Sequence, residues 1–293
     1  MSGKRDGAFL VVGLVRNCER SLGRDVERLR TALGDVRALH WFLVESDSTD
    51  RTVRILESLR ATVGNFDFRS LGDLTGVHPR RTERLAFCRN VYAKAIRDSE
   101  TLRDIDYVIV ADFDGINAAV TPGALASCWD TRIDWDMCAA NQAGPYYDIW
   151  ALRHETWSPN DCWEQYRFLN RFNGKTERNI WSAVYAKMIT IPGDHAWIEV
   201  DSAFGGLAIY RKSLFQNAEY EGVSENGEEI CEHVSLHSSM RKSGAKMFIN
   251  PRLINSGYNE HSRVLRPARR IVIRTKSLLR RFVTQAFRVV APG

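Results

Sequence analysis

The first 112 residues alternate between short apolar runs and amphipathic stretches, and this alternation limits the possible folds more than any other feature of the sequence. The run AFLVVGLV at residues 8–15 is short and rich in β-branched side chains, as in a strand buried on both faces. A regular succession of strand and helix predicts an α/β fold with a Rossmann-like, mostly parallel sheet flanked by helices. We expect strands at 8–15, 39–45, 66–70 and 106–112, and helices at 24–33, 48–59 and 82–98.

The second half of the chain carries weaker signals. Residues 146–170 are dense in Tyr, Trp and His but show little periodicity, and no linker or internal repeat is apparent. A single domain over residues 1–262, followed by a tail at 263–293, fits the sequence best. We expect further strands at 135–140, 205–211 and 246–251, the last ended by Pro251, and helices at 178–188 and 229–243.

Several of the predicted strands end in polar clusters. In open α/β sheets the ligand binds beyond the carboxyl ends of the strands, so polar side chains that follow different strands gather in one place. This arrangement predicts a single ligand site at that edge of the sheet. The residues are Arg16 and Asn17 after the first strand, Glu45 and Asp47 at the second, and Asp112 and Asp114 after the fourth.

Asp112 and Asp114 form the strongest of these signals. Side chains alternate along an extended chain, so the two carboxylates point to one side and Phe113 points to the other. Carboxylates held together repel each other unless a positive charge lies between them. Mg²⁺ or Mn²⁺ suits the pair, because such ions are commonly shared between carboxylates and substrate phosphates. The alternative is a plain turn built by Asp114 and Gly115.

The turn after the second strand and the helix at 82–98 supply further candidates. Glu45 and Asp47 can accept hydrogen bonds from ribose hydroxyls or a base edge, whereas helix capping by Ser48 or Thr49 explains the same stretch without a ligand. Arginine forks bind diphosphate oxygens well. At the start of this helix Arg80 and Arg81 fit a solvated face, and the candidates for contact with a nucleotide are Arg84, Arg89 and Asn90.

Charge is distributed unevenly along the chain. Nine of its 41 basic residues follow Glu260 and no acidic residue does, so the preceding body keeps more acids than bases. In the tail, Leu279, Val283 and Phe287 recur at every fourth position among the bases, which predicts a basic amphipathic helix. Peripheral contact with an anionic membrane and docking on the protein body both fit this pattern. We expect no nucleic-acid binding, because the acidic body repels phosphate and no reader motif accompanies the tail.

The six cysteines indicate the cellular compartment. No CxxC pair occurs, so a zinc ribbon or a redox motif is not expected. Cys18, Cys88 and Cys138 lie within apolar patterns and fit reduced core thiols. The apolar run at 8–15 is too short to span a membrane, and no small-residue cleavage site follows it. We expect a cytoplasmic protein, at most peripheral at the membrane.

Six segments, spread over nearly the whole body of the chain, carry a resemblance to a known family. They are VESDSTDRT (44–52), RTERLAFCRN (81–90), VADFD (110–114), YYDIWALRH (146–154), FGGLAIYR (204–211) and ICEHVSLHSSMRKSG (230–244). Similar blocks in the same order make the chain resemble sugar-nucleotide glycosyltransferases of the GT-A fold and, more narrowly, the fungal capsule-associated α-1,3-mannosyltransferase family. The chain departs from that family at the acidic pair, often Asn-Asp there, and at a Ser-Glu-Cys segment that is Cys-Glu-His here.

The resemblance implies a metal-dependent glycosyltransferase, a hexosyltransferase with a GT-A type fold. The donor it implies is GDP-mannose, with a UDP-sugar as the alternative, and the acceptor is a hydroxyl of a glycan or lipid-linked acceptor in surface polysaccharide or glycan synthesis. Mn²⁺ or Mg²⁺ would be held by Asp112 and Asp114, and Asp112 would also contact the donor. GT-A enzymes often add a C-terminal histidine to the metal. Here His261 is the candidate, and His195 and His237 compete with it.

The resemblance also implies a catalytic carboxylate and an acceptor region. Inverting GT-A enzymes place a base on the helix after the Gly-rich strand, where Glu232 lies, and Asp201 is a second candidate. A base must reach the acceptor hydroxyl with a pKa near the working pH. A retaining reaction requires no such base, and stabilisation of the helix N-terminus also explains Glu232. The acceptor candidates are Asp148, Arg153, Trp157, Gly205 and Gly206, with Trp163 weighed beside Trp157 and Trp150 expected in the core.

Two other functions stay open at the level of sequence. A sugar nucleotidyltransferase would need a Gly-rich loop with Lys or Arg after the first strand, and GLVRNCERSLGRD at 13–25 lacks one. A non-catalytic module that binds a membrane or nucleic acid through its tail would show no nucleotide binding by the body. Nucleotide binding by residues 1–262 therefore separates this last reading from the enzyme readings.

Overall fold

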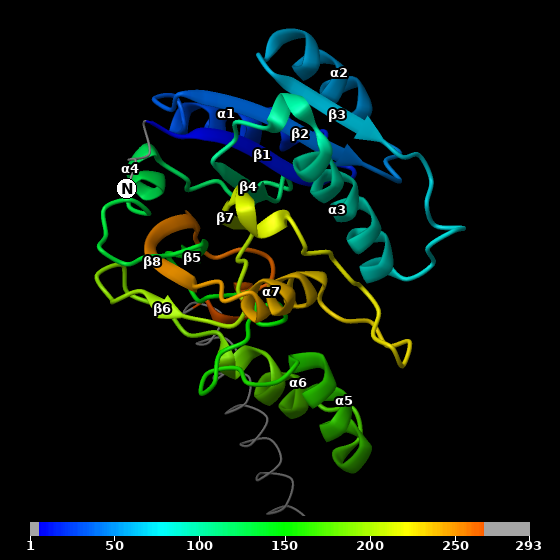
Figure 1. Ribbon diagram of the computed structural model, residues 1–293. Coiled ribbons are helices and arrows are strands. Elements are labelled where there is room, and N and C mark those ends of the chain that lie inside the picture. Colours follow the sequence, from blue (N-terminus) through cyan, green and yellow to red (C-terminus); the bar gives the residue numbers. More distant parts are fainter. Residues whose placement is uncertain (1–5, 267–293) are drawn as a thin grey trace, which may run out of the picture.

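The computed structural model describes residues 6–266 and shows an α/β fold built on one sheet (Figure 1). Eight strands form this sheet. Along the chain the elements are β1 (Ala8–Val15), α1 (Leu22–Ala32), β2 (Ala38–Glu45), α2 (Thr52–Thr62), β3 (Phe66–Ser70), α3 (Arg81–Asp98), β4 (Tyr107–Ala111), α4 (Pro122–Ala126), β5 (Met137–Gln142), α5 (Cys162–Asn173), α6 (Glu177–Ala183), β6 (Ile198–Glu199), β7 (Leu207–Arg211), α7 (Glu232–Lys242) and β8 (Met247–Ser256).

Strand direction divides the sheet, whose order is β3-β2-β1-β4-β7-β5-β8-β6. The four strands from the first part of the chain, β3, β2, β1 and β4, pair in parallel. β7 lies antiparallel between β4 and β5, and β6 lies antiparallel to β8 at the edge. β5 and β8 again pair in parallel. The predicted fold class, a mostly parallel sheet flanked by helices, is confirmed.

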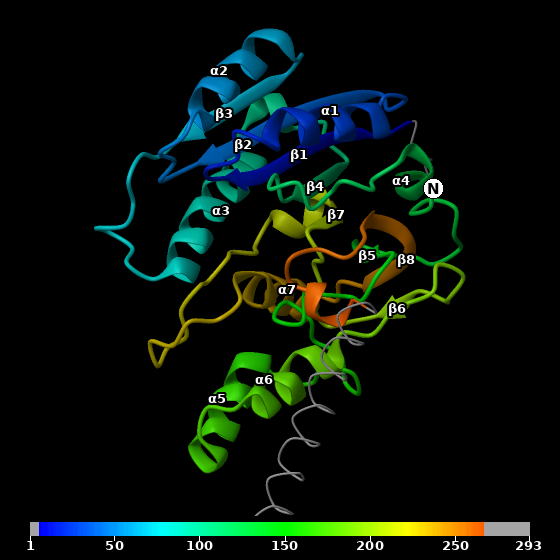
Figure 2. The ribbon, with the colours of Figure 1, turned by 180° about the vertical axis from the view of Figure 1, so that it is seen from behind.

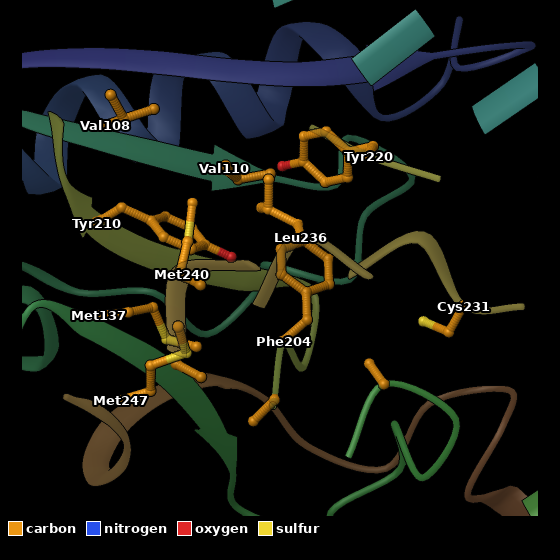
Figure 3. Close-up of a cluster of buried hydrophobic side chains, with 14 of the residues drawn as sticks. Val108, Val110, Met137, Phe204, Tyr210, Tyr220, Cys231, Leu236, Met240 and Met247 are labelled. Carbon is orange, nitrogen blue, oxygen red and sulfur yellow. The ribbon is translucent and has the colours of Figure 1, made fainter. Parts of the chain in front are cut away.

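The two faces of the sheet bury different helices. Along β1, Phe9 and Val11 pack on the face covered by α1 and α4, whereas Leu10 and Val12 pack on the face covered by α3 and α7. All four side chains are fully buried, and each contributes about 1.5–3 kcal/mol by leaving water. The second face includes aromatic, methionine and aliphatic side chains from β4, β5, β7, α7 and β8 (Figure 3). The continuous apolar run of the first strand follows from this burial on both sides.

Gly13 leaves room for the turn that follows β4. A Cβ atom on Gly13 would lie 2.2 Å from the carbonyl oxygen of Ala111 and 2.5 Å from the ring of Phe113. That ring is 1% exposed and belongs to the core on the α1 face. Only glycine therefore fits at this point of the strand, beside the residues that lead into Asp112.

We expect Gly13→Ala to destabilise the fold by about 1–3 kcal/mol, because the added methyl group overpacks a rigid contact with backbone. Urea unfolding followed by circular dichroism measures the change. Gly23→Ala is the matched control: a Cβ atom on Gly23, in α1, would meet nothing within 4 Å, so alanine there should be neutral or stabilising by up to about 1 kcal/mol. Equal stability of the two variants would contradict the prediction.

Three local expectations need correction. α5 occupies part of the stretch that showed little periodicity, because Cys162 is its one fully buried side chain and no apolar stripe marks it. β8 does not end at Pro251 but continues to Ser256, since its pairing with β5 shifts register around the proline. α2 begins at Thr52, because Asp50 rather than Ser48 or Thr49 accepts the first backbone N–H, from Thr52 at 2.9 Å.

His237 is buried in the core between α7 and β7. Its Nδ1 lies 2.8 Å from the hydroxyl of Ser202 and its Nε2 lies 2.9 Å from the hydroxyl of Tyr210. Burial lowers the pKa of His237 to about 3. Both ring nitrogens are thus engaged within the protein, and the imidazole is neutral at physiological pH. His237 is accordingly excluded as a metal ligand.

The same burial predicts acid sensitivity. Below pH 6.5 the unfolded chain protonates His237 while the folded chain does not, so stability falls as pH drops from about 6.5 to about 3. The expected loss from this residue is on the order of 4 kcal/mol over that window. Unfolding free energies measured at several pH values should fall less steeply for His237→Gln than for the wild type. His195→Gln, at an exposed position, serves as control and should follow the wild-type slope.

All six cysteines lie within the described residues, where they are buried and free, in agreement with the expected core thiols. Across residues 6–266, no helix has the length and apolar character needed to cross a bilayer. Of the predicted tail, only 263–266 is described, and Arg263–Leu265 forms a short 3₁₀ helix there. The predicted amphipathic helix lies outside the described residues.

Candidate functional site

A cleft of about 340 Å³ opens at the carboxyl ends of β1, β2 and β4 and is closed on its far side by α3 and α7. It gathers charged side chains that are distant in sequence, as the strand ends predicted. Phe204, beside the glycine pair, and Tyr147 form part of its wall. Of the predicted site residues, the cleft is lined by Arg16, Asp47, Arg84, Arg89, Asp112, Asp114, Asp148, Glu232 and His261.

Asp112 and Asp114 both line the cleft, and Phe113 between them is buried in the core. The backbone N–H of Asp112 donates to the carbonyl oxygen of Gly206 at 3.0 Å, which ties the residue to the strand-β7 side of the sheet. Oδ1 of Asp114 accepts a hydrogen bond from the N–H of Ile116 at 3.1 Å. Asp114 therefore takes part in the turn, as the alternative interpretation predicted. Its second carboxylate oxygen is left available to the cleft.

The electrostatic environment of Asp112 is unusual. Its side chain keeps 34% of its surface exposed in the cleft, but protein surrounds it otherwise. Burial raises the pKa of Asp112 to about 7; Arg89 opposes the rise, and the carboxylates of Asp114, Asp148 and Glu232 add to it. A group of carboxylates that repel one another in this way is stabilised by a cation.

Arg89 forms the centre of a buried ion pair. Its Nε donates to Oε1 of Glu232 at 3.0 Å and its Nη1 donates to the hydroxyl of Tyr92 at 3.1 Å. Nη2 lies 3.8 Å from Oδ1 of Asp112, and the guanidinium lies 5.6 Å from the ring centroid of Phe204. Most of the guanidinium donors of Arg89 are engaged by the protein. Arg89 therefore offsets the negative charge of the carboxylates in the cleft, and Glu232 holds the Arg89 side chain in place.

The turn after β2 presents Asp47 between two arginines. Nε of Arg16 donates to the carbonyl oxygen of Asp47 at 3.3 Å, and Nε of Arg84 lies 3.9 Å from Oδ2. Asp47 has a positive φ of 58°, and its Oδ1 accepts from the N–H of Leu74 at 2.8 Å. Nη1 of Arg84 donates to the carbonyl oxygens of His78 and Pro79 at 2.7 and 2.9 Å. This part of the cleft therefore combines an acceptor for hydroxyl groups with the fork of Arg16 and the positive charge of Arg84.

Two neighbouring candidates hold this turn instead of lining the cleft. Glu45 is 2% exposed and accepts hydrogen bonds from the N–H of Ser48 at 3.0 Å and from the hydroxyl of Ser70. Oδ1 of Asn17 accepts from the N–H of Thr49 at 2.8 Å. Both side chains are engaged in shaping the loop around Asp47.

The structure places two further candidates away from the cleft. Asn90 is bound to the backbone of Tyr220 at both ends of its amide, donating at 2.9 Å and accepting at 2.9 Å, so it anchors the loop before α7. Asp201 is exposed and pairs with Arg241, with Oδ1 3.3 Å from Nη2. The sequence could not distinguish these positions, because the partner of Asn90 on α3 and the place of Asp201 both depend on loops without periodic signals.

Of the acceptor candidates, some line the cleft and others do not. Arg153 donates to the carbonyl oxygens of Trp150 and Leu152 and to Oδ2 of Asp161 at 3.0 Å, which makes it a brace of this loop. Nε1 of Trp157 donates to the carbonyl oxygen of Lys187 at 2.7 Å. Neither is among the residues lining the cleft.

Gly205 and Gly206 shape the cleft through the backbone. Their φ angles are +70° and +85°, which only glycine adopts readily, and a Cβ atom on Gly206 would lie 2.8 Å from the hydroxyl of Tyr147. The N–H of Gly205 donates to Oδ2 of Asp148 at 3.0 Å. This bond fixes the Asp148 carboxylate, whose pKa burial raises.

A second cavity, about 930 Å³ in volume and here called the groove, adjoins the cleft. The two share Arg81, Tyr147, Asp148, Trp150 and His261. Arg81 is exposed, as expected, but it also lines both cavities. Trp150, expected in the core, is partly exposed and lies at this junction. The remaining groove lining is largely aromatic and aliphatic and includes Ile149, Trp163, Tyr166, Ile180, Val184, Tyr185, Met188 and Val264.

His233 is a cleft residue that the sequence reasoning did not single out. It is 3% exposed and stacks on Phe204 with ring centroids 3.9 Å apart. Both of its ring nitrogens lack a hydrogen-bond partner among the described residues. Burial and the nearby Arg89 lower the pKa of His233 well below the usual range, so the ring is neutral. Its position next to Glu232 was the one signal that could have identified it.

The donor set suits a hard divalent cation. Within residues 6–266 no group of three or more His, Cys, Asp or Glu side chains is arranged as a complete metal site. Mg²⁺ and Mn²⁺ need no such group when phosphate oxygens complete the shell, and two carboxylates lining one cleft meet that requirement. His261, stacked on Tyr147 at 5.3 Å, lines the same cleft, whereas His195 is exposed and does not line it.

No protein-family model matches the chain, and no curated protein matches it. Solved structures with similar folds include the mannosyltransferase PcManGT from Pyrobaculum calidifontis in complex with GDP-Man and Mn²⁺, at 12% identity and a TM-score of 0.47, covering 86% of this chain and 56% of that one. S. aureus TarS 1-349 in complex with UDP-GlcNAc is 14% identical with a TM-score of 0.47, covering 87% of this chain and 60% of that one. The chain thus spans little more than half the length of the solved structures it resembles.

Proposed function

We propose that this protein is a metal-dependent glycosyltransferase that moves a hexose from a nucleotide sugar to a hydroxyl group. The observation that carries the proposal is the convergence of Asp112 and Asp114 with Arg16, Asp47 and Arg84 in one cleft at the carboxyl ends of three parallel strands. Such an edge is where α/β sheets bind nucleotides. The acidic pair and the arginines together match a diphosphate and its cation.

The nucleotide diphosphate would lie along the β1 and β2 side of the cleft. Arg16 supplies a fork for its oxygens, Arg84 adds positive charge, and Asp47 can accept from ribose hydroxyls. Asp112, Asp114 and His261 would hold Mn²⁺ or Mg²⁺, which neutralises the charge that develops on the departing diphosphate. GDP-mannose is the donor that the family resemblance favours, and a UDP-sugar is the alternative.

The acceptor would enter through the groove. Asp148 lines both cavities, so an acceptor hydroxyl group beside it would lie next to the cleft that holds the donor. Burial raises the pKa of Asp148 above its ordinary value, which is the direction that favours proton uptake by a carboxylate base. Glu232, the sequence candidate for this role, is held in the pair with Arg89 and acts in our proposal as a positioning residue. The aromatic lining suits a glycan or lipid-linked acceptor.

Thermal-shift measurements with GDP-, UDP- and CDP-sugars, with and without Mn²⁺, test the donor assignment. We expect at least one sugar nucleotide to raise the melting temperature in a metal-dependent manner, and Asp112→Ala and Asp114→Ala to abolish that rise. Asp194→Ala, at an exposed aspartate outside the cleft, should behave as the wild type. A protein that none of these nucleotides stabilises is not an enzyme of this class, and a rise that survives chelation removes the metal from the proposal.

The acceptor assignment predicts a separate kinetic effect. Trp163→Ala removes an indole from the groove, so we expect KM for the acceptor to rise about tenfold, the equivalent of one stacking contact, with KM for the donor unchanged. Trp181→Ala, at a tryptophan that is 41% exposed outside the groove, is the control and should change neither value. A rise in donor KM for Trp163→Ala would place the acceptor elsewhere.

A further inference from the structure

The helical hairpin formed by α5 and α6 carries an exposed aromatic pair. Phe168 and Phe172 lie one turn apart on α5, with ring centroids 5.1 Å apart, and are 55% and 74% exposed. The buried side of the helix is marked by Cys162 instead. Single apolar residues on a surface are ordinary, but two large rings in contact at a protruding element indicate an interaction surface.

Bases lie next to this pair along the chain. The tip of the hairpin, residues 171–178, is exposed throughout and contains Arg171, Lys175 and Arg178 against one acid, Glu177. Aromatic rings beside a cluster of bases are the combination by which peripheral proteins bind anionic lipid surfaces. The charge of the tip is therefore complementary to an anionic bilayer.

Hydrogen bonds hold the tip in this shape. Nδ2 of Asn179, a residue 2% exposed, donates to Oδ1 of Asn170 at 2.9 Å and to the carbonyl oxygen of Gly174 at 2.8 Å. Thr176 caps α6 by accepting from the N–H of Asn179 at 3.3 Å. The aromatic pair is thus presented on a preformed hairpin, which reduces the entropy lost on docking.

We propose that this tip docks on an anionic lipid bilayer, with Phe168 and Phe172 at the headgroup boundary and the three bases beside the anionic headgroups. The tail at 263–293 is a poor occupant of the tip, because its nine bases and no acids give it the same sign of charge. An anionic surface, in contrast, attracts both segments.

The position of the hairpin fits this role. In both views α5 and α6 lie at the end of the molecule opposite α2 (Figure 1 and Figure 2). Trp163, Tyr166 and Ile180 of the same hairpin also line the groove. Docking the tip therefore brings the groove close to the bilayer, where a lipid-borne acceptor would be found. Only this last consequence rests on the proposed function.

Co-sedimentation of the full chain with vesicles tests the proposal without measuring activity. We expect binding to vesicles of phosphatidylcholine with phosphatidylglycerol and weak binding to phosphatidylcholine alone. Arg171→Gln/Lys175→Gln/Arg178→Gln should weaken binding to the anionic vesicles on the order of a hundredfold, since each base near such a surface contributes roughly fivefold. Phe168→Ser/Phe172→Ser should weaken it by at least about tenfold.

Matched variants elsewhere control for charge and hydrophobicity. Arg20→Gln/Arg54→Gln/Arg69→Gln removes three exposed bases from other elements, and Val77→Ser removes a side chain that is 72% exposed. Both should bind as the wild type, and all variants should keep its melting temperature. The proposal is overturned if the hairpin variants bind like the wild type, which would assign binding to the tail, or if the wild type ignores anionic vesicles or binds neutral ones equally.

Discussion

Asp112→Asn is expected to lower the transfer rate by about a hundred- to a thousandfold while leaving the folded protein at least as stable as the wild type. The rate falls because the variant loses a charge that would hold the cation at the diphosphate, and removal of one such electrostatic contact typically has an effect of this size. The stability is kept because the amide of asparagine retains the shape of the side chain and carries no charge.

The stability effect has a defined pH dependence. In the folded protein the pKa of Asp112 is raised to about 7 from its ordinary value of 3.8, so the folded state holds this proton more tightly than the unfolded state. The contribution of Asp112 to stability is therefore greatest below about pH 4 and is lost as pH rises to about 7. Without added metal, the melting temperature of Asp112→Asn relative to the wild type should rise across that window.

Two measurements decide this prediction. Initial rates with a donor found by thermal shift report the loss of activity, and melting curves recorded in chelator at a series of pH values report the stability. Asp194→Asn provides the control for removing an exposed carboxylate. A variant that keeps its rate within a factor of about ten of the wild type would show that Asp112 has no part in the chemistry.

Arg89→Ala is expected to destabilise the protein by about 3–5 kcal/mol, the largest loss predicted for any single change here. The substitution leaves Glu232, which is 4% exposed, without its partner and removes the positive charge nearest to Asp112. An unpaired buried carboxylate lowers the free energy of unfolding by far more than the intact ion pair raises it. The loss should appear in urea unfolding at pH 7.

The same helix provides a contrast. Lys94 pairs with Asp98 at 2.5 Å, but both side chains are more than half exposed, so Lys94→Ala should cost no more than about 1 kcal/mol. The double variant Arg89→Ala/Glu232→Gln should recover part of the stability lost by Arg89→Ala alone, because no unpaired charge remains at position 232. If the double variant is less stable than either single variant, repulsion of the buried carboxylate is not the cause.

The sequence was sufficient to predict the parallel strands and the residues at their ends, because a parallel sheet allows few alternative arrangements. Apolar runs must be buried on both faces of a parallel sheet, and the ends of such strands meet at one edge, so Arg16, Asp47, Asp112 and Asp114 had to come together. The same reasoning could not reach Asp148 or His233, because they come from a loop and from α7; Asp148 was named only through its family-like segment at 146–154. Their distance from the strand ends is set by tertiary packing alone.

Other errors have equally specific causes. Periodicity reports burial and not strand direction, so the antiparallel insertion of β7 was beyond prediction. α5 buries only Cys162 completely and therefore lacks the apolar stripe that reveals most helices. Asn90 and Arg153 lie within family-like segments, but their side chains are bound to backbone, and only coordinates distinguish a brace from a ligand contact.

The place of β7 in the sheet has a consequence for protein engineering. This strand, formed by residues 207–211, separates β4 from β5, and the carbonyl oxygen of Gly206 just before it anchors the amide of Asp112. A fragment ending after β4 would lose that anchor and expose an unpaired edge, which invites aggregation. The two halves of the chain therefore cannot be exchanged as independent units, and chimaeras of this protein should exchange surface loops rather than cut between β4 and β5.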